Sequence, residues 1–395
     1  MKTSPVAAIG ILLLLGCAAA SVAQDATPAQ NGPPAPLPFP LHVPEGFSIS
    51  LVSDQIRGAR FLAVAPNGDV LVSLISRGQV VAIHPGDRVS APPQIVANGL
   101  SRPNGVAFRG DDLYIATWTG VVRIRNYGSG NRRIEVLFDD MPRNGGHTAR
   151  AIALANDGTI YVSSGSTCNV CTENDPRLAT ILRYSPGNAT PGGAGTYVGA
   201  IYARGLRNAS GLALDDTGQL WAVVNQRDNL TPSHDNLPPD ELDRVVEGAN
   251  YGWPYCYPID DRRVPNPEFP GAVCGQYLPT SWNFQAHSAP LQALYYPAPG
   301  AMLPDDESAF PAEFRGSLFA AFHGSWNRQP PTGYKVIVVH FKDGRPAAEE
   351  DFVTGWLTAD NRVLGRPVGI AVAADGSLYV SDDTGLLFRV SYKAR

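Results

Sequence analysis

The chain has 395 residues, of which 17% are Asp, Glu, Lys or Arg, compared with about 25% in an ordinary soluble domain. Hydrophobic residues make up 44% and the net charge is -5, so the composition excludes a disordered or fibrous chain and a basic nucleic-acid binder. The 40 glycines and 35 prolines indicate a globular protein rich in turns, most simply an all-β protein.

The first 23 residues have the pattern of a secretory signal peptide. Lys2 is followed by an apolar run from Val6 to Leu15 and then by small residues up to Ala23. This run is too short to cross a bilayer as a helix and no later apolar segment is long enough, so we expect an exported protein without a transmembrane segment. Two alternatives stay open: a free periplasmic or secreted protein cleaved after Ala23, or a protein anchored through a lipid on Cys17.

Residues 24–40 are rich in Pro, Ala and Gln, which predicts a flexible leader. Beyond it, one hydrophobic pattern recurs six times. Each copy has two short alternating segments joined by a tight turn, and most copies are followed by a third segment, as expected of antiparallel strands. The marker glycines of the six turns are Gly68, Gly110, Gly158, Gly218, Gly316 and Gly376.

Each copy predicts one small sheet whose hydrophobic faces can be covered only by neighbouring copies. Stacking in a closed ring also protects the edges of the sheets. We therefore predict an all-β fold, a six-bladed β-propeller, as a single domain over residues 41–395. The interval between Gly218 and Gly316 is the longest, so we expect an insertion around residues 250–315.

Four cysteines follow the predicted signal peptide, and in an oxidising compartment their default state is disulfide-bonded. Of the three possible pairings, the short spacings favour Cys168 with Cys171 and Cys256 with Cys274. A redox-active Cys-x-x-Cys and a zinc site are the weaker alternatives, because no βαβ context surrounds the first pair. Thr172, rather than His, follows that pair, so no c-type haem attachment motif is present here and electrons would have to leave for an external acceptor.

Four arginines occupy similar positions, just before the first segment of a predicted blade. They are Arg102, Arg150, Arg207 and Arg366. In a closed propeller such positions face one region at the mouth of the central channel. Any one of these arginines is equally explained by a carboxylate partner between blades. As a set, they favour a site for a multiply charged anion that guanidinium groups bind bidentately.

Two further segments carry chemistry. Residues 323–328 supply His323, Trp326 and Arg328, with Lys335 shortly after them, although Trp326 taken alone is better explained by packing. Oxygen-bearing residues are dense between residues 225 and 254, and in this density they favour a hard cation such as calcium, which takes about six to eight oxygen ligands. An ordinary solvated loop is the alternative explanation for these acids.

With these residues in view, the chain resembles the pyrroloquinoline-quinone (PQQ)-dependent glucose/sorbosone dehydrogenase family, most closely its sorbosone-dehydrogenase-like branch. Members of this family are six-bladed propellers that oxidise sugars. The resemblance covers nearly the whole mature chain and rests on five motifs in order: GGHTARAIALANDGTIYVSSGSTCNVC, GLRNASGLAL, DELDRVVEGANYGWPYCYP, HGSWNRQPPTGYKV and GRPVGIAVAADGSLYVSDD. Single pieces of these motifs occur in unrelated propellers, but the five together are specific.

The resemblance implies roles for individual residues. His147 matches the general base that takes a proton from the substrate hydroxyl, a task that suits an imidazole at neutral pH. Arg207, which we group with His147 as catalytic, and Asn208 match a pair that contacts cofactor and substrate. Lys335 and Arg366 match residues that bind the carboxylates and quinone oxygens of PQQ. The same clusters add as cofactor-binding candidates Arg150, His323, Trp326 and Arg328.

The resemblance also implies calcium. Arg227 and Asp228 match the position where backbone carbonyls hold an activating calcium ion, and Glu241 with Tyr251 match a structural calcium position. Asp240 is a further metal candidate from the same acidic segment. The chain departs from the pattern here, because the glucose-oxidising members have Gly-Pro where this chain has Arg227 and Asp228.

A second departure concerns the substrate. In the glucose-oxidising members the catalytic histidine follows an aspartate that contacts the sugar, whereas here Gly146 precedes His147. The sequence therefore predicts an exported quinoprotein that oxidises a sugar to a lactone or acid with PQQ and calcium, and passes electrons to an external cytochrome or quinone. The alternatives are a calcium-dependent lactonase-type hydrolase on the same fold, and a non-catalytic propeller that binds carbohydrate or protein.

Overall fold

The computed structural model describes residues 1, 35–143, 145–187, 197–230, 236–297 and 309–393. These residues form six four-stranded antiparallel sheets, which confirms the prediction of an all-β, six-bladed propeller. The predicted signal peptide, Cys17 and most of the leader lie outside the described residues, as do residues 298–308 of the predicted insertion. Within the described part of the chain, no helix has the length and apolar character needed to cross a membrane.

The first three sheets follow the chain in order. The first contains β2 (Ala59–Val64), β3 (Val70–Leu74), β4 (Gln79–Ile83) and β5 (Gln94–Ala97). The second contains β6 (Val106–Arg109), β7 (Asp112–Ala116), β8 (Val121–Ile124) and β9 (Ile134–Phe138). The third contains β10 (Ile152–Leu154), β11 (Ile160–Ser164), β12 (Thr180–Pro186) and β13 (Tyr197–Arg204).

Of the other three sheets, the fourth and the sixth differ in how their outer strand is supplied. The fourth contains β14 (Ala209–Leu214), β15 (Leu220–Val224), β16 (Glu241–Arg244) and β19 (Trp282–Asn283), with the separate hairpin of β17 (Cys256–Ile259) and β18 (Arg262–Pro265) between its last two strands. The fifth contains β20 (Pro290–Tyr296), β21 (Ser317–Phe322), β22 (Lys335–Lys342) and β23 (Arg345–Val353). The sixth contains β24 (Pro367–Val372), β25 (Leu378–Asp382), β26 (Leu387–Tyr392) and β1 (Phe47–Ser53).

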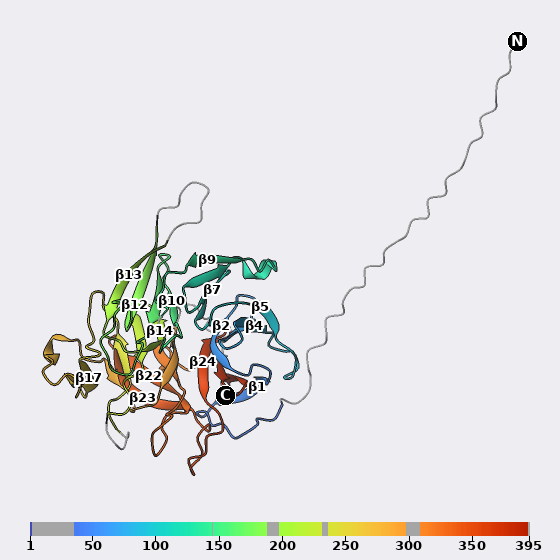
Figure 1. Ribbon diagram of the computed structural model, residues 1–395. Coiled ribbons are helices and arrows are strands. Elements are labelled where there is room, and N and C mark those ends of the chain that lie inside the picture. The colour runs from blue at the N-terminus through green and yellow to red at the C-terminus, as the bar shows by residue number, and fades with distance from the viewer. Residues whose placement is uncertain (2–34, 144, 188–196, 231–235, 298–308, 394–395) are drawn as a thin grey trace.

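The sixth sheet closes the ring by joining the two ends of the chain. Strand β1 pairs antiparallel with β26, with Phe47 opposite Tyr392, and Figure 1 shows β1 beside the carboxyl terminus. The Phe47 ring lies 4.8 Å from that of Phe310 and 5.2 Å from that of Phe352, centroid to centroid. Closure therefore buries aromatic side chains and joins the two ends of the chain within one sheet.

The repeated glycines have a backbone cause. All six marker glycines have positive φ angles, between 55° and 96°, which side chains with a Cβ rarely adopt. Other glycines lie where the first strands of adjacent sheets meet. A Cβ on Gly211 in β14 would lie 2.1 Å from the carbonyl oxygen of Leu291 in β20, so only glycine permits this approach between sheets.

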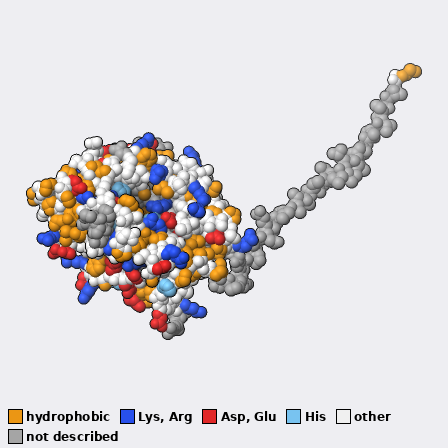
Figure 2. Space-filling view, turned by 60° about the horizontal axis from the view of Figure 1, so that its bottom comes forward, with side chains coloured by type: hydrophobic (Ala, Val, Ile, Leu, Met, Phe, Trp, Pro, Cys, Tyr) orange, Lys and Arg blue, Asp and Glu red, His pale blue; other side chains and the backbone are white. Residues whose placement is uncertain are grey.

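The strand connections fall on two opposite faces of the ring. In an antiparallel sheet successive connections alternate between its ends, so the segments that enter a first strand share a face with those that join second strands to third strands. This face, which we call the loop face, therefore collects residues 145–151, 165–179 and 323–334. On the side of the molecule in Figure 2, Lys and Arg side chains extend from the rim toward the middle, while acidic side chains gather mainly along one edge.

Candidate functional site

Two adjoining cavities on the loop face bring most of the predicted site residues together. The first, the Asp228 cavity, has a volume of about 190 Å³ and is lined by Arg207, Asp228 and Trp326 among others. The second, the Arg60 cavity, has a volume of about 360 Å³. His147 and Asn208 line both cavities and therefore mark their junction.

The imidazole of His147 is held at its Nδ1 atom. Nδ1 lies 3.0 Å from the carbonyl oxygen of Ser166 and 3.0 Å from its Oγ. Because a carbonyl oxygen only accepts hydrogen bonds, Nδ1 carries the proton and Nε2 keeps a lone pair. Burial, together with the positive charge of Arg207, lowers the pKa of His147 to about 4. The side chain is therefore neutral at pH 7 and able to accept a proton.

Two glycines make room for His147. A Cβ on Gly165, just after β11, would lie 2.5 Å from the Cβ of His147 and 3.0 Å from Oδ1 of Asn208. Gly146 has a φ of 87°, and a Cβ there would lie 2.5 Å from the carbonyl oxygens of Ser166 and Thr167. An aspartate, as in the glucose-oxidising enzymes that the sequence resembles, does not fit at Gly146 unless this loop moves.

The guanidinium of Arg207 is hydrogen-bonded to oxygen atoms of the protein. Its guanidinium donates to the carbonyl oxygens of Asn169 at 3.1 Å and Gln226 at 2.7 Å, and it lies 3.4 Å from Oδ2 of Asp228. The side chain is buried, and burial lowers the pKa of Arg207. This arginine therefore fixes three loops relative to one another beside His147.

A disulfide-closed loop completes this arrangement. The structure contains the disulfides Cys168–Cys171 and Cys256–Cys274, as the sequence favours. Asn169, inside the first loop, accepts from Arg207 Nη2 at 3.0 Å and from the Asp228 backbone N–H at 2.9 Å. Its Nδ2 donates to the Asp228 carbonyl at 2.8 Å. The disulfide therefore organises the loop that positions both Arg207 and Asp228.

The Asp228 carboxylate faces the cavity and is ionised. Trp326 Nε1 donates to its Oδ1 at 3.2 Å, and Nδ1 of His287 lies 3.6 Å from the same atom. Burial alone would raise the pKa of Asp228, but His287, Arg207 and Trp326 outweigh it and lower that pKa. Trp326 itself is 70% exposed, so its indole lies at the entrance rather than in a packed core.

The other metal candidates have separate surroundings. Asp240 lines the Asp228 cavity, but its two oxygens accept the backbone N–H groups of Gln226 and Ala289, and burial raises its pKa to about 6. Glu241 is buried against Arg263 at 2.6 Å. The Tyr251 hydroxyl donates to the Arg244 carbonyl at 2.5 Å. Arg227 pairs with Glu268 at 2.6 Å.

Several candidates for cofactor contact instead support the loops. Arg150, 1% exposed, donates to the Pro142 carbonyl at 2.7 Å, and Arg328 donates to the Ala286 carbonyl at 2.9 Å. Lys335 pairs with Asp351 at 2.5 Å. None of these three lines either cavity among the described residues. Sequence position therefore identifies the blade register of a residue but not the direction of its side chain.

Arg366 and His323 lie near the channel without lining the cavities. Arg366 donates to the carbonyl oxygens of Gly324 at 2.7 Å and Ser325 at 2.9 Å. His323 Nδ1 is 3.2 Å from the Pro367 carbonyl. Burial, Arg60 and Arg366 together lower the pKa of His323 to about 3, so this imidazole is neutral.

The sequence interpretation missed two residues that line the cavities. Arg60 in β2 precedes Leu62 by two residues, as Arg150 precedes Ile152, so the repeat itself contained the signal. His287 belongs to the loop before β20 and matches no repeat position. It is 6% exposed with a φ of 59°, and its Nε2 has no hydrogen-bond partner among the described residues.

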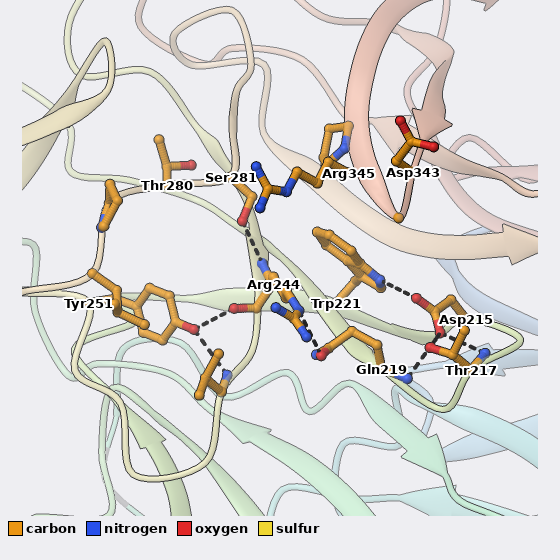
Figure 3. Close-up of a pocket in the computed structure, with 15 residues that line it drawn as sticks. Asp215, Thr217, Gln219, Trp221, Arg244, Tyr251, Thr280, Ser281, Asp343 and Arg345 are labelled. Carbon is orange, nitrogen blue, oxygen red and sulfur yellow. Dashed lines mark hydrogen bonds between the residues drawn. The ribbon is translucent and has the colours of Figure 1, made fainter.

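A cavity larger than these two lies elsewhere. Its volume is about 720 Å³, and turn residues from the fourth and fifth sheets line it on the face opposite the loops. Figure 3 shows that its polar groups bond to one another: Trp221 Nε1 donates to Asp215 at 2.9 Å, and Arg244 donates to Gln219 at 2.8 Å. Tyr251 is the one predicted site residue on its lining, so this cavity does not assemble the candidate site.

Comparisons with known proteins identify the family of this chain. A family model described as TrAA12-like matches residues 41–393. An uncharacterised protein of Borreliella burgdorferi is 27% identical over 381 residues, covering 89% of this chain and 91% of that protein. The pyrroloquinoline quinone-dependent pyranose dehydrogenase of Coprinopsis cinerea is 27% identical over 417 residues, covering 89% of this chain and 54% of that enzyme. The chain thus spans about half the length of the enzyme.

Solved structures share the fold. The holo form of the PQQ domain of Coprinopsis cinerea pyranose dehydrogenase gives a TM-score of 0.72 at 21% identity, covering 91% of this chain and 98% of that domain. The calcium structure of the Trichoderma reesei AA12 enzyme gives 0.71 at 21% identity, covering 90% and 98%. The PQQ-bound aldose sugar dehydrogenase of Streptomyces coelicolor gives 0.56 at 18% identity, covering 88% and 100%.

Proposed function

The chain belongs to the TrAA12-like family, and from that premise we propose that it is a PQQ-dependent dehydrogenase that oxidises a sugar, with His147 as the general base. The observation that carries the proposal is the buried, neutral imidazole of His147 at the junction of two cavities. Similarity to the pyranose dehydrogenase supports a sugar as the substrate class.

The residues of the Arg60 cavity fit an acidic cofactor. PQQ carries three carboxylates, which need cationic donors. Arg60 and Arg102 line this cavity, and Nε of Arg60, a hydrogen-bond donor, is buried without a partner among the described residues. Asn208 lies at the junction with the other cavity. We therefore propose that these two cavities would hold PQQ, and that Arg60 and Arg102 would bind its carboxylates.

The residues of the Asp228 cavity fit calcium. Asp228 supplies an ionised carboxylate, and Oδ1 of Asn225, which lines the same cavity, is buried and lacks a partner in the described part of the chain. Hard oxygen donors of this kind are the ligands that calcium prefers. Asp228 and Asn225 would hold the ion. The side chains of Arg227, Glu241 and Tyr251 would not, because each bonds to other protein groups.

The chain's own residues move the proton. When bound, PQQ would supply an acceptor for the hydride of the substrate carbon, and calcium would increase the electrophilicity of that acceptor. Nε2 of His147 takes the hydroxyl proton of that carbon, so the C–H and O–H bonds break as the C=O bond forms. Ser166 keeps the imidazole in the Nδ1–H form through its carbonyl oxygen. Arg207, through the Asn169 loop, keeps the two walls of the cavity at a fixed distance.

The cellular location of the protein and the acceptor of its electrons are part of the proposal. We propose export to the periplasm or the medium, with Cys17 as an anchor if it is lipidated, and transfer of electrons to an external acceptor such as a cytochrome or quinone. The two disulfides suit an oxidising compartment.

A reconstitution assay tests the proposal. Purified protein is incubated with PQQ and calcium, and dye reduction is followed with a panel of aldoses, ketoses and osones. We expect activity with at least one sugar, lost when PQQ is omitted and reduced when calcium is removed by chelation. Absence of turnover with every sugar, in protein that demonstrably binds PQQ, would contradict the assignment.

A further inference from the structure

The two disulfides of the chain differ in how far solvent reaches them. Cys256 and Cys274 are buried, with 0% and 7% of their surface exposed. Cys168 and Cys171 are half-buried, and Thr172 directly after them is exposed. The first bridge therefore lies at the surface of the loop face, within reach of a soluble thiol, whereas the second is covered by the protein. Access of this kind determines which disulfide exchanges with thiols.

Asn169 lies between the two cysteines of the accessible bridge and joins three segments of the site. Its Oδ1 accepts from Arg207 Nη2 at 3.0 Å and from the backbone N–H of Asp228 at 2.9 Å. Its carbonyl oxygen accepts from Arg207 Nε at 3.1 Å and from Trp253 Nε1 at 3.1 Å. The position of Asn169 therefore fixes Arg207 and Asp228 relative to each other.

The bridge closes this loop where hydrogen bonds do not. At the amino-terminal end of the loop, the Ser166 hydroxyl donates to the Cys168 carbonyl at 2.8 Å. At the other end, no backbone–backbone hydrogen bond of the described residues includes Val170 or Cys171. Once the S–S bond is broken, the segment around Asn169 regains conformational entropy, which favours release of its contacts.

The base of the loop is held independently of the bridge. The carboxylate of Glu173 accepts from the Thr167 N–H at 2.6 Å and from the Thr167 hydroxyl at 2.8 Å. His147 is held by Ser166, which precedes the loop. Breaking the bridge would therefore free residues 168–171 without detaching the neighbouring strands, and closing it again would restore the loop.

We propose that Cys168–Cys171 is a site of thiol–disulfide exchange that controls the candidate site, with a dithiol as its partner. One thiolate of the dithiol attacks a sulfur of the bridge, and the second thiol then resolves the mixed disulfide. The chain gains two electrons and two protons as two cysteine thiols, and the dithiol becomes a disulfide. Reduction releases Asn169, so Arg207 and Asp228 lose their common contact. The fall in activity that follows rests on the proposed function, whereas the exchange and the release of the loop do not.

The first experiment needs neither cofactor nor substrate. The purified full-length protein is treated with dithiothreitol, and the free thiols are located over time by alkylation and peptide mass spectrometry. We expect Cys168–Cys171 to be reduced at least about tenfold faster than Cys256–Cys274, the matched control in the same molecule. Equal rates, or a first bridge that resists dithiothreitol until the protein unfolds, would overturn the inference.

Hydrogen exchange then shows whether the loop transmits the change. The Asp228 N–H donates to Asn169, so we expect it to exchange about five- to tenfold faster after reduction. The double variant Cys168→Ser with Cys171→Ser should exchange as fast without a reductant. Asn169→Ala should exchange fast before and after reduction, because the contact is already absent. An exchange rate of Asp228 that reduction leaves unchanged would overturn the inference.

The melting temperature checks that the double serine variant is folded. If that variant does not fold, the wild type compared before and after reduction, with Asn169→Ala beside it, gives the same decision. A reduced wild type whose whole chain exchanges faster would show global unfolding instead of a local release and would overturn the inference.

The activity arm compares sugar oxidation by the reduced and the reoxidised protein. Dithiothreitol is removed without air before PQQ and calcium are added, because thiols reduce quinones. We expect kcat/KM to fall about tenfold on reduction and to recover after treatment with oxidised glutathione, while the double serine variant stays slow and insensitive to both reagents. Full activity of the reduced protein would overturn control of the site by the bridge. If the oxidised wild type turns over no sugar, the proposed function fails, and the exchange measurements still decide whether the bridge controls the loop.

Discussion

Substitution of Gly165 by alanine should displace His147, the proposed general base, without changing that residue itself. The added Cβ would lie 2.5 Å from the Cβ of His147, whereas carbon atoms in contact prefer about 3.5 Å or more. The two atoms must therefore separate by about 1 Å. The second neighbour, Oδ1 of Asn208 at 3.0 Å, limits movement of the new methyl in the other direction. Most of the shift therefore falls on His147.

The size of the effect follows from this displacement. Misplacing a catalytic group by about 1 Å costs on the order of 100-fold in rate, and overpacking a filled site costs roughly 1–3 kcal/mol of stability. We expect Gly165→Ala to lower kcat by about that factor while its PQQ affinity stays near that of wild type. The assays are steady-state kinetics of the reconstituted enzyme, quinone titration and thermal melting.

Gly145→Ala is the matched control, because it makes the same change in the segment before His147 and its Cβ would meet no atom within 4 Å. We expect this variant to retain wild-type kinetics. A Gly165→Ala enzyme with kcat within threefold of wild type would refute the reasoning that this contact sets the position of His147.

Three further predictions concern the same site. Asn169→Ala removes the amide that joins Arg207 to Asp228, so we expect kcat/KM to fall at least tenfold and activation by calcium to weaken. Titration of activity with calcium measures both effects, and an unchanged calcium requirement would contradict this role of Asn169. The acid limb of the pH profile of kcat/KM should lie near pH 4, since the lowered pKa keeps His147 neutral above that value. The free energy of unfolding contributed by neutral His147 is complete above about pH 6.5 and is lost as the pH falls toward 4. An acid limb at pH 6.5 would contradict both expectations. Gly146→Asp should lower the melting temperature and activity toward every sugar, glucose included, because its Cβ meets two carbonyl oxygens; a gain of glucose activity would contradict the steric argument.

The fold was predictable because local and global signals coincide. Each tight turn needs a positive φ, so glycine recurs at each of the six turns, and each pair of alternating segments can form only a small sheet. The pairing of β1 with β26 was harder to predict from the sequence, since no turn or motif relates Phe47 to Tyr392 across the whole chain.

The site was predictable in part, through motifs that fix the backbone. His147, Arg207 and Asn208 lie together as expected, because each directly precedes or enters a first strand. Arg150 and Lys335 carried the same kind of signal, but their side chains turn to Pro142 and Asp351. The position of a residue in the blade repeat does not determine which rotamer a Lys or Arg side chain adopts.

His287 shows what sequence reasoning lacked. Its loop is held by contacts from distant segments: Arg328 donates to the Ala286 carbonyl and Asp240 accepts from the Ala289 N–H. Neither contact has a spacing or composition signature. A residue placed only by such long-range bonds becomes visible when the structure is known.

The central claim is that His147 removes the substrate proton at a PQQ site, and a single-turnover measurement tests it most directly. Protein loaded with PQQ and calcium is mixed with the best sugar from the panel, and reduction of the quinone is followed by its absorbance. We predict that His147→Gln binds PQQ as tightly as wild type and reduces it about 100- to 10,000-fold more slowly. Equal rates of reduction in the two proteins would contradict the account.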